Sequence, residues 1–154
     1  MKVKNVLLGL ALLVSTVAFA QEKGDFNGFA GLTYPLESGS DLGITAGVEY
    51  VFAEDFSIAP SYTYYFSDPG SNSQFDIDLR YYLGDDSFNW FLTGGVSFLR
   101  SEFMGISANT TGFAGGAGAL FSLGDSFDLM AVVKYNSELA GGSIVPTLGL
   151  SFGL

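Results

Sequence analysis

The chain has 154 residues, of which 48% are hydrophobic and 16% aromatic, and its formal charge is −10 at pH 7. So acidic a chain argues against nucleic-acid binding, which needs Lys and Arg to neutralise phosphates. Neither His nor Cys occurs, so the commonest general base and metal ligand is missing and disulfides cannot hold the fold.

The first twenty residues have the three parts of a secretory signal peptide. Two lysines lie within the first four residues, an apolar run covers 6–14, and Ala-Phe-Ala at 18–20 is a small-x-small cleavage site. The apolar run is shorter than the roughly 20 residues that a membrane-spanning helix needs. We therefore expect export, with residues 1–20 removed and residues 21–154 forming one domain. In that domain four basic residues face 16 acidic ones, a charge of −12.

Alternation of apolar and polar residues predicts eight strands in the domain. In the clearest segment every even position is apolar, whereas the odd positions are small or polar apart from one Val. This period of two indicates strands with two different faces, and it would scatter the apolar residues around a helix. The segments are about ten residues long, enough to cross a bilayer at a tilt. They cover 25–34 (the weakest), 41–52 (the clearest), 56–66, 74–83, 88–98, 111–121, 127–136 and 144–154.

The connections between these segments alternate in length. The tight turns are 53–55, 84–86 and 124–125, and the longer loops are 35–40, 67–73, 101–110 and 137–142. Outer-membrane barrels have short periplasmic turns on one rim and longer loops on the other, so both termini are expected on the periplasmic rim. Pro60 and Pro146 fall in mid-strand, where each removes a ladder hydrogen bond, and we expect a bulge or local widening at each.

Aromatic residues on the apolar faces gather at two heights. Near the short-turn rim they are Tyr50, Phe52, Phe56, Tyr81, Phe88, Trp90, Phe121, Phe127 and Phe152. Near the long-loop rim they are Tyr34, Tyr64, Phe66, Phe75, Phe98 and Tyr135. Two aromatic belts around an aliphatic band match the profile of a bilayer. The predicted fold class is therefore an all-β, eight-stranded antiparallel up-and-down transmembrane β-barrel. The alternative is a soluble β-sandwich or lipocalin-like barrel, which would turn these faces inward.

The polar face would line the interior, which side chains fill in a barrel of eight strands. Glycines leave room there for Tyr65, Tyr82, Phe91 and Met130, so we expect no continuous pore. The ionisable residues of this face are Glu49, Asp76, Asp78, Arg80, Asp128 and Lys134.

A buried charge is costly unless it is paired. We therefore predict that Arg80 bridges Glu49 and Asp78, and that Lys134 neutralises Asp76 across the lumen. A polar plug that fixes the strand register is the preferred interpretation of this network, and a gated ion path is the alternative.

No catalytic arrangement is predicted. Without His, a Ser–His pair cannot be assembled, and the sequence contains no nucleotide, cofactor or metal motif. We expect a protein that is not an enzyme and binds no cofactor or metal.

From about Asp25 to Leu154 the chain resembles the small outer-membrane β-barrel superfamily, the OmpA-like and OmpX-like proteins. The resemblance rests on the eight alternating segments and on the last strand, which keeps the pattern Leu148, Leu150 and Phe152 but ends in Leu rather than Phe. It implies a location in the outer membrane of a Gram-negative cell, assembly by the outer-membrane machinery, and a monomer.

The resemblance also implies a structural, adhesion or defence role. We expect a structural or surface-interaction barrel that meets an extracellular ligand through the loops around Pro35, Pro69, Phe103 and Leu139. The alternative is a narrow channel or transporter for small or hydrophobic solutes.

Overall fold

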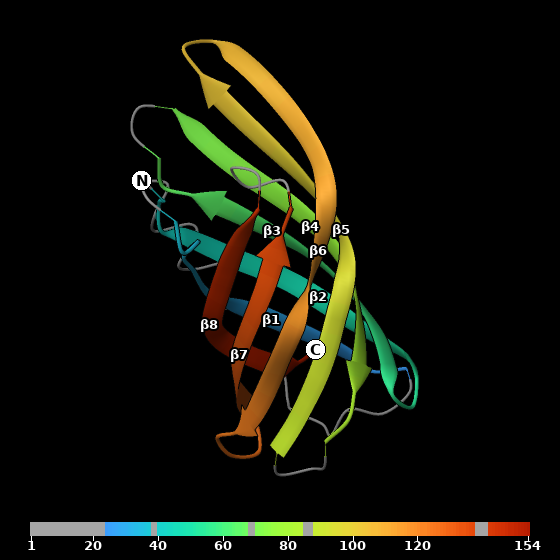
Figure 1. The fold of residues 1–154 in the computed structure, drawn as a ribbon. Coiled ribbons are helices and arrows are strands. Elements are labelled where there is room, and N and C mark those ends of the chain that lie inside the picture. The colour runs from blue at the N-terminus through green and yellow to red at the C-terminus, as the bar shows by residue number, and fades with distance from the viewer. Residues whose placement is uncertain (1–23, 38–39, 68–69, 85–87, 138–141) are drawn as a thin grey trace.

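The computed structural model describes residues 24–154 except 38–39, 68–69, 85–87 and 138–141. Its strands are β1 (Phe26–Thr33), β2 (Gly43–Ala53), β3 (Phe56–Tyr65), β4 (Ser71–Tyr82), β5 (Phe88–Phe103), β6 (Ile106–Ser122), β7 (Phe127–Asn136) and β8 (Ser143–Gly153). Consecutive strands pair antiparallel, and β1 pairs with β8 to close the barrel (Figure 1). The predicted eight-stranded up-and-down barrel is confirmed. The predicted signal peptide lies outside the described residues.

The two faces of each strand are sorted as the alternation predicts. In β2, Thr45 and Glu49 are buried in the barrel interior, whereas Ile44 and Val48 are exposed on the outer face. The pleat of a strand produces this alternation. Large apolar side chains thus cover the outside and polar ones fill the inside, which is opposite to the soluble alternative. In the described part of the chain, no helix is long and apolar enough to cross a membrane.

The predicted loop over 101–110 is wrong, because β5 and β6 continue through it. The two strands pair as far as Phe103 opposite Ile106, and only Met104 and Gly105 form the turn. Both turn residues have positive φ, 50° and 78°, as a two-residue type I′ hairpin turn requires. Figure 1 shows this hairpin reaching beyond the ends of the other strands. We call residues 99–113 the outer hairpin.

Pro60 widens the ladder without shifting it. On one side of β3, Pro60 pairs in register with Ile77 of β4. On the other side, paired residues are Gly47 with Ser61 and then Tyr50 with Ile58, in the same register but with the two positions between them unpaired. The missing N–H of proline explains this local opening, which is the predicted widening.

Pro146 needs neither a bulge nor a widening, so that expectation is wrong. Its pairing with Val133 of β7 keeps the regular register of β7 and β8. On its other side the Pro146 carbonyl accepts a hydrogen bond from the Tyr34 N–H at 3.1 Å, directly after β1 ends at Thr33. The hydrogen bond from the Leu36 N–H to the Ile144 carbonyl, at 2.8 Å, continues the same register past the proline, so the missing N–H of Pro146 leaves the pairing of its neighbours intact.

Candidate functional site

A buried arginine lies in the lumen, two residues from the short-turn end of β4. Arg80 Nη1 lies 3.2 Å from Glu49 Oε2, with the two side chains 5% and 0% exposed. The guanidinium carbon lies 4.6 Å from the ring centroid of Phe29 and 4.8 Å from that of Phe91. Aromatic faces attract a cation most strongly when water is excluded. Arg80 is therefore held by one carboxylate and two aromatic rings.

Glu49 has partners for both of its oxygens. Oε2 faces Arg80, while Oε1 accepts hydrogen bonds from the Ser57 hydroxyl and, at 2.5 Å, from the Tyr82 hydroxyl. Each hydrogen bond offsets part of the desolvation cost of a fully buried carboxylate. Both oxygens of Glu49 thus have partners from the protein, and the side chain has no contact with solvent.

Two glycines make room for the rings on either side of Arg80. A Cβ at Gly47 would overlap the ring of Phe29, and a Cβ at Gly118 would overlap that of Phe91. The sequence signal for Phe91 and for inward glycines was visible in the alternation. Phe29 was missed as a contact of Arg80, because its strand has the weakest alternation of the eight.

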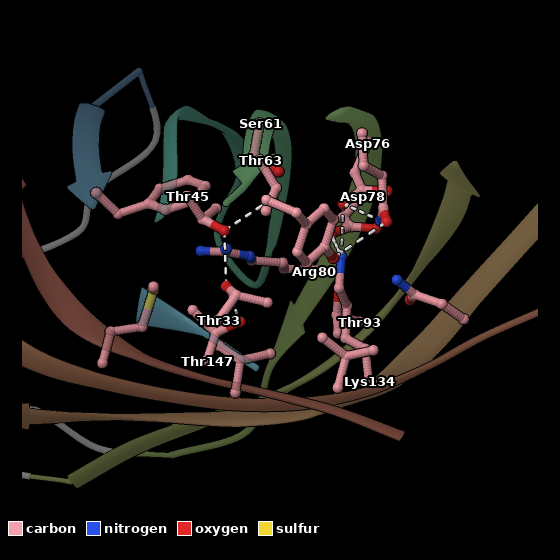
Figure 2. Close-up of a pocket in the computed structure, with 17 residues that line it drawn as sticks. Thr33, Thr45, Ser61, Thr63, Asp76, Asp78, Arg80, Thr93, Lys134 and Thr147 are labelled. Atoms are coloured by element: carbon pink, nitrogen blue, oxygen red, sulfur yellow. Dashed lines mark hydrogen bonds and ion pairs between the residues drawn. The ribbon is translucent and has the colours of Figure 1, made fainter. Parts of the chain in front are cut away.

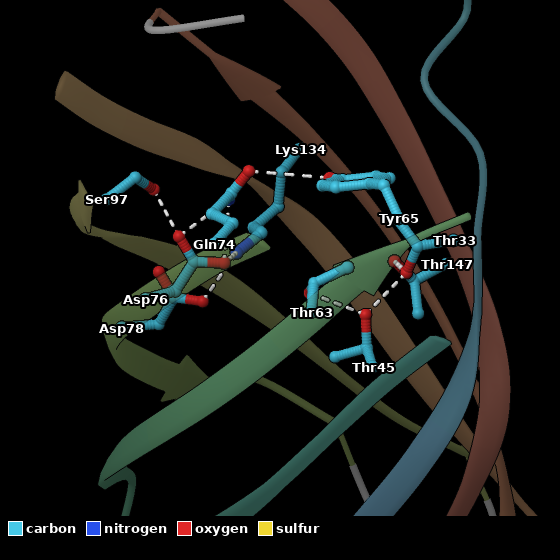
Figure 3. A network of polar contacts seen from close by, with 10 residues as sticks. All are labelled: Thr33, Thr45, Thr63, Tyr65, Gln74, Asp76, Asp78, Ser97, Lys134 and Thr147. Atoms are coloured by element: carbon cyan, nitrogen blue, oxygen red, sulfur yellow. Dashed lines mark hydrogen bonds and ion pairs between the residues drawn. The ribbon is translucent and has the colours of Figure 1, made fainter. Parts of the chain in front are cut away.

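A second charge cluster lies beside the first. Lys134 Nζ on β7 lies 2.8 Å from Asp78 Oδ2 and 3.3 Å from Asp76 Oδ2, both on β4 (Figure 3). Asp76 also accepts hydrogen bonds from the amide nitrogen of Gln74, at 2.8 and 2.9 Å, and from the Ser97 hydroxyl. Side chains of three strands, β4, β5 and β7, are thereby joined across the lumen.

The prediction that Arg80 bridges Asp78 is wrong, since Asp78 forms its ion pair with Lys134. The reason is the stagger of the strands. Hydrogen-bonded rows lean across a barrel because the strands tilt, and the row that contains Arg80 also contains Lys134, through Thr93 and Gly116. Arg80 lies two residues from the end of β4 and Lys134 seven from the start of β7, so distance from the short turn does not fix the row of a residue.

Asp128 is not joined to these clusters. It lies half-buried near the short-turn end of β7, and within the described chain it forms no ion pair. Five of the six predicted lumen charges thus gather in two adjoining groups, and the sixth stays at the rim.

A chain of threonine hydroxyls follows the lumen wall formed by β8, β1, β2 and β3. Thr147, Thr33, Thr45 and Thr63 follow one another at 2.8, 2.7 and 2.7 Å between hydroxyl oxygens. These threonines line a common cavity with Asp76, Asp78, Arg80 and Lys134 (Figure 2). Its volume is about 30 Å³. A cavity of this size admits about two water molecules, so it is no ligand pocket. The described residues include no group of three acidic, His or Cys side chains placed to hold a metal ion.

The aromatic residues of both predicted belts lie on the outer face, with Phe127 and Phe152 partly covered. Rings of neighbouring strands contact one another within each belt. The centroid distances are 4.7 Å for Phe26–Tyr50, 4.8 Å for Phe56–Tyr81, 5.1 Å for Phe88–Phe121 and 6.4 Å for Phe75–Phe98. Phe26 thus joins the belt at the short-turn rim, in addition to the residues that the sequence predicted for it.

Beyond the aromatic belt at the long-loop rim, called the upper belt below, the outer hairpin presents an apolar tip. Phe103 is 51% exposed, Met104 84% and Ile106 74%. The loop around Pro35 is described and exposes Leu36, whereas Pro69 and Leu139 lie outside the described residues.

No protein-family model matches the chain, and no curated protein matches it either. Solved structures do. The N-terminal β-barrel domain of Pseudomonas aeruginosa OprF has a TM-score of 0.75 at 17% identity, over 87% of this chain and all of that one. A de novo designed transmembrane β-barrel has a TM-score of 0.68 at 16% identity, over 88% of this chain and all of that one.

A third similar structure is Ail, the attachment invasion locus protein of Yersinia pestis, in complex with the heparin analogue sucrose octasulfate. Its TM-score is 0.63 at 15% identity, over 86% of this chain and all of that one. At such identities the likeness shows the fold alone. The resemblance to small outer-membrane barrels is therefore confirmed at the level of architecture.

Proposed function

We propose that this chain is an exported outer-membrane β-barrel with a plugged lumen, which acts as a structural or surface-interaction protein and not as an enzyme or a pore. The observation that carries the proposal is Arg80, held between Phe29 and Phe91 and paired with Glu49. The plug leaves the ends of the barrel, and above all the outer hairpin, as the parts that can meet another molecule.

Two observations support a membrane location. The outer face is apolar around the barrel and carries ring-to-ring contacts at two heights, as expected where a bilayer meets its headgroup layers. The similar solved structures include natural outer-membrane barrels and a barrel designed to cross membranes. Bulk water would leave the same surface with a large uncovered apolar area.

The lumen supports a plug better than a channel. A conducting path needs a continuous column of water, whereas the interior here holds fully buried Phe91, Met130 and Glu49. The lumen cavity, which Arg80, Met130 and Lys134 help to line, measures about 30 Å³, too small for a solute. Opening the path would require Arg80 to leave both rings and its carboxylate together.

The chemistry of the outer hairpin argues against a polyanionic ligand of the kind seen bound to Ail. Arg100 is the one basic residue of the outer hairpin, and its Nη2 is paired with Glu102 Oε1 at 2.6 Å. With a formal charge of −10 on the whole chain, a sulfated sugar would be repelled. A protein partner fits this surface better.

Planar-bilayer recording on the purified, refolded protein tests the proposal. Heat-dependent mobility on a denaturing gel first establishes that the barrel is closed. We expect no stepwise conductance from the wild type and none from Arg80→Met, since Met can still fill the space between the two rings. Discrete single-channel steps from the wild type would overturn the plugged-barrel proposal in favour of a channel.

A further inference from the structure

The two charge clusters of the lumen hold one more negative charge than positive. Glu49 is balanced by Arg80, at 3.2 Å. Lys134, by contrast, faces two carboxylates, Asp76 at 3.3 Å and Asp78 at 2.8 Å. Each of these side chains is no more than 11% exposed. A buried charge without a counter-charge is costly, so one further positive charge is needed beside Lys134.

The described chain supplies no further side-chain cation for this position. Its basic residues are Arg80, Arg100 and Lys134. Arg100 lies on the outer hairpin, where its side chain is 59% exposed and paired with Glu102. The counter-charge therefore comes from outside the described chain, as a bound cation or as a proton.

Three buried oxygens without partners line the cavity beside this excess charge. Among the described residues, no hydrogen-bond partner reaches Asp78 Oδ1, Thr93 Oγ1 or Asn136 Oδ1. These residues are 3%, 8% and 1% exposed, and they line the lumen cavity from β4, β5 and β7. Figure 2 shows Asp78 and Thr93 at this cavity. Buried polar atoms in native proteins are almost always partnered, so the three oxygens indicate a bound species.

The chemistry of these oxygens favours a cation over a proton. Asp78 Oδ1 and Asn136 Oδ1 are both acceptors and cannot satisfy each other. A proton on Asp78 would balance the charge but would leave the cavity unfilled. Carboxylate, amide and hydroxyl oxygens are ligands of hard cations. The volume of about 30 Å³ admits a small ion with one water molecule, but no organic cation.

We propose that the lumen cavity binds one Na⁺ ion, held by Asp78 Oδ1, by the side-chain oxygens of Thr93 and Asn136, and by a water molecule. The single excess charge calls for a monovalent ion. Arg80 Nε also lacks a partner among the described residues and lines the cavity, and it donates to that water molecule. No sequence motif marks the site, because its ligands come from three separate strands. The inference does not depend on the proposed surface role.

The two neighbouring cationic side chains do not exclude the ion. The charge of Arg80 is offset by Glu49. Lys134 is paired with the Oδ2 atoms of Asp76 and Asp78, which leaves Asp78 Oδ1 free to bind the ion. Two carboxylates shared by one ammonium group and one monovalent ion carry no net charge, so the proposed ion completes the charge balance of the lumen.

Urea unfolding of the purified, refolded barrel in nonionic detergent micelles tests for the ion. The measurements are made in sodium, potassium and choline chloride at equal concentration, in Tris buffer of one pH. We expect the unfolding equilibrium constant of the wild type to be about tenfold smaller in sodium chloride than in choline chloride, as for an ion whose Kd is about one tenth of its concentration. Potassium chloride should have a smaller effect, because K⁺ is the larger ion.

Asp78→Asn and Asp128→Asn are a matched pair of variants. Each removes one carboxylate charge, but Asp78 lines the cavity whereas Asp128 is half-buried near the short-turn end of β7. Asp78→Asn should lose the sodium effect, and Asp128→Asn should keep it. Thr93→Val leaves every charge in place and removes one proposed ligand. It should reduce the sodium effect, and it tests the site even if Asp78→Asn does not fold.

Four results would overturn the proposal. Equal stability of the wild type in the three chlorides would leave only ordered water in the cavity. Stability that ignores sodium but rises at lower pH in the wild type, and not in Asp78→Asn, would assign the counter-charge to a proton. An equal effect of K⁺ would contradict the assignment to Na⁺. Equal loss of the sodium effect in the Asp78 and Asp128 variants would indicate general charge screening. The plugged-barrel proposal is tested separately, by conductance.

Discussion

Arg80 Nη1 lies 3.2 Å from Glu49 Oε2 in a part of the lumen where neither side chain exposes more than 5% of its surface. At that burial, the loss of one partner leaves the other as an uncompensated charge. A buried pair of this kind costs more to break than to replace entirely. The pair is therefore a sensitive probe of how the interior is organised.

Arg80→Met is expected to destabilise the barrel by about 3–5 kcal/mol, because the buried Glu49 carboxyl loses its cationic partner. The double variant Glu49→Gln/Arg80→Met should lose less than the single one, since no charge is then left unpaired. Urea unfolding of the refolded protein in detergent micelles measures both. If the single variant matches the wild type, the ion pair contributes nothing and the explanation of the plug fails.

Gly118→Ala should destabilise by about 1–3 kcal/mol, because the new methyl group overlaps the Phe91 ring and forces it from its place beside Arg80. Gly94→Ala is the matched control. Its Cβ would point to the open outer face, 3.9 Å from the nearest atom, the Ala114 carbonyl oxygen. That change should be neutral or slightly stabilising, since glycine weakens a strand. The same unfolding assay decides, and equal losses at both positions would contradict the packing explanation.

Thr45→Val removes the hydroxyl that bonds both Thr33 and Thr63. We expect a loss of about 1–2 kcal/mol. Thr147→Val should cost less, because Thr147 is the end of the chain of hydroxyls and Thr33 keeps Thr45 as a partner. The order of the two losses in thermal or urea unfolding is the measurement. A larger loss at Thr147 would show that the hydroxyl chain is not the stabilising unit.

Met104→Asn should strengthen the outer hairpin. Met104 has a φ of 50°, a conformation that Asn adopts far more readily, and Asn-Gly is the preferred type I′ pair. Slower hydrogen exchange at the amides of Phe103 and Ile106 is the expected result, with unchanged exchange in β1 as the control. Faster exchange at the tip would argue against a type I′ turn.

The sequence alone predicted the sidedness of every strand because the bilayer-facing and lumen-facing environments differ so sharply. The same signal fails above the upper belt. From Ser101 to Thr110 both strand faces meet water, so apolar and polar residues do not alternate and the segment resembles a loop. There β5 and β6 are held by backbone pairing with each other, and backbone pairing does not depend on the hydropathy of the side chains.

The lumen contacts could be predicted only in part. That Arg80 and Glu49 share the interior follows from parity along the strands. Which carboxylate meets which cation depends on the stagger of the barrel, and Asp78 reaches Lys134 for that reason. Parity carries no information about stagger, and neither does composition.

The aromatic belt also sets a limit on reach. Phe98 belongs to the upper belt and Phe103 ends β5, so five residues of strand, at most about 17 Å, separate the membrane boundary from the hairpin tip. In the proposed orientation the outer hairpin therefore lies in the shallow layer just above the lipid headgroups. A bulky folded domain would collide with the bilayer before it contacted the side of the outer hairpin, whereas an extended, unfolded segment can reach it. The aromatic belt thus limits the shape of a binding partner as well as setting the depth of the barrel in the membrane.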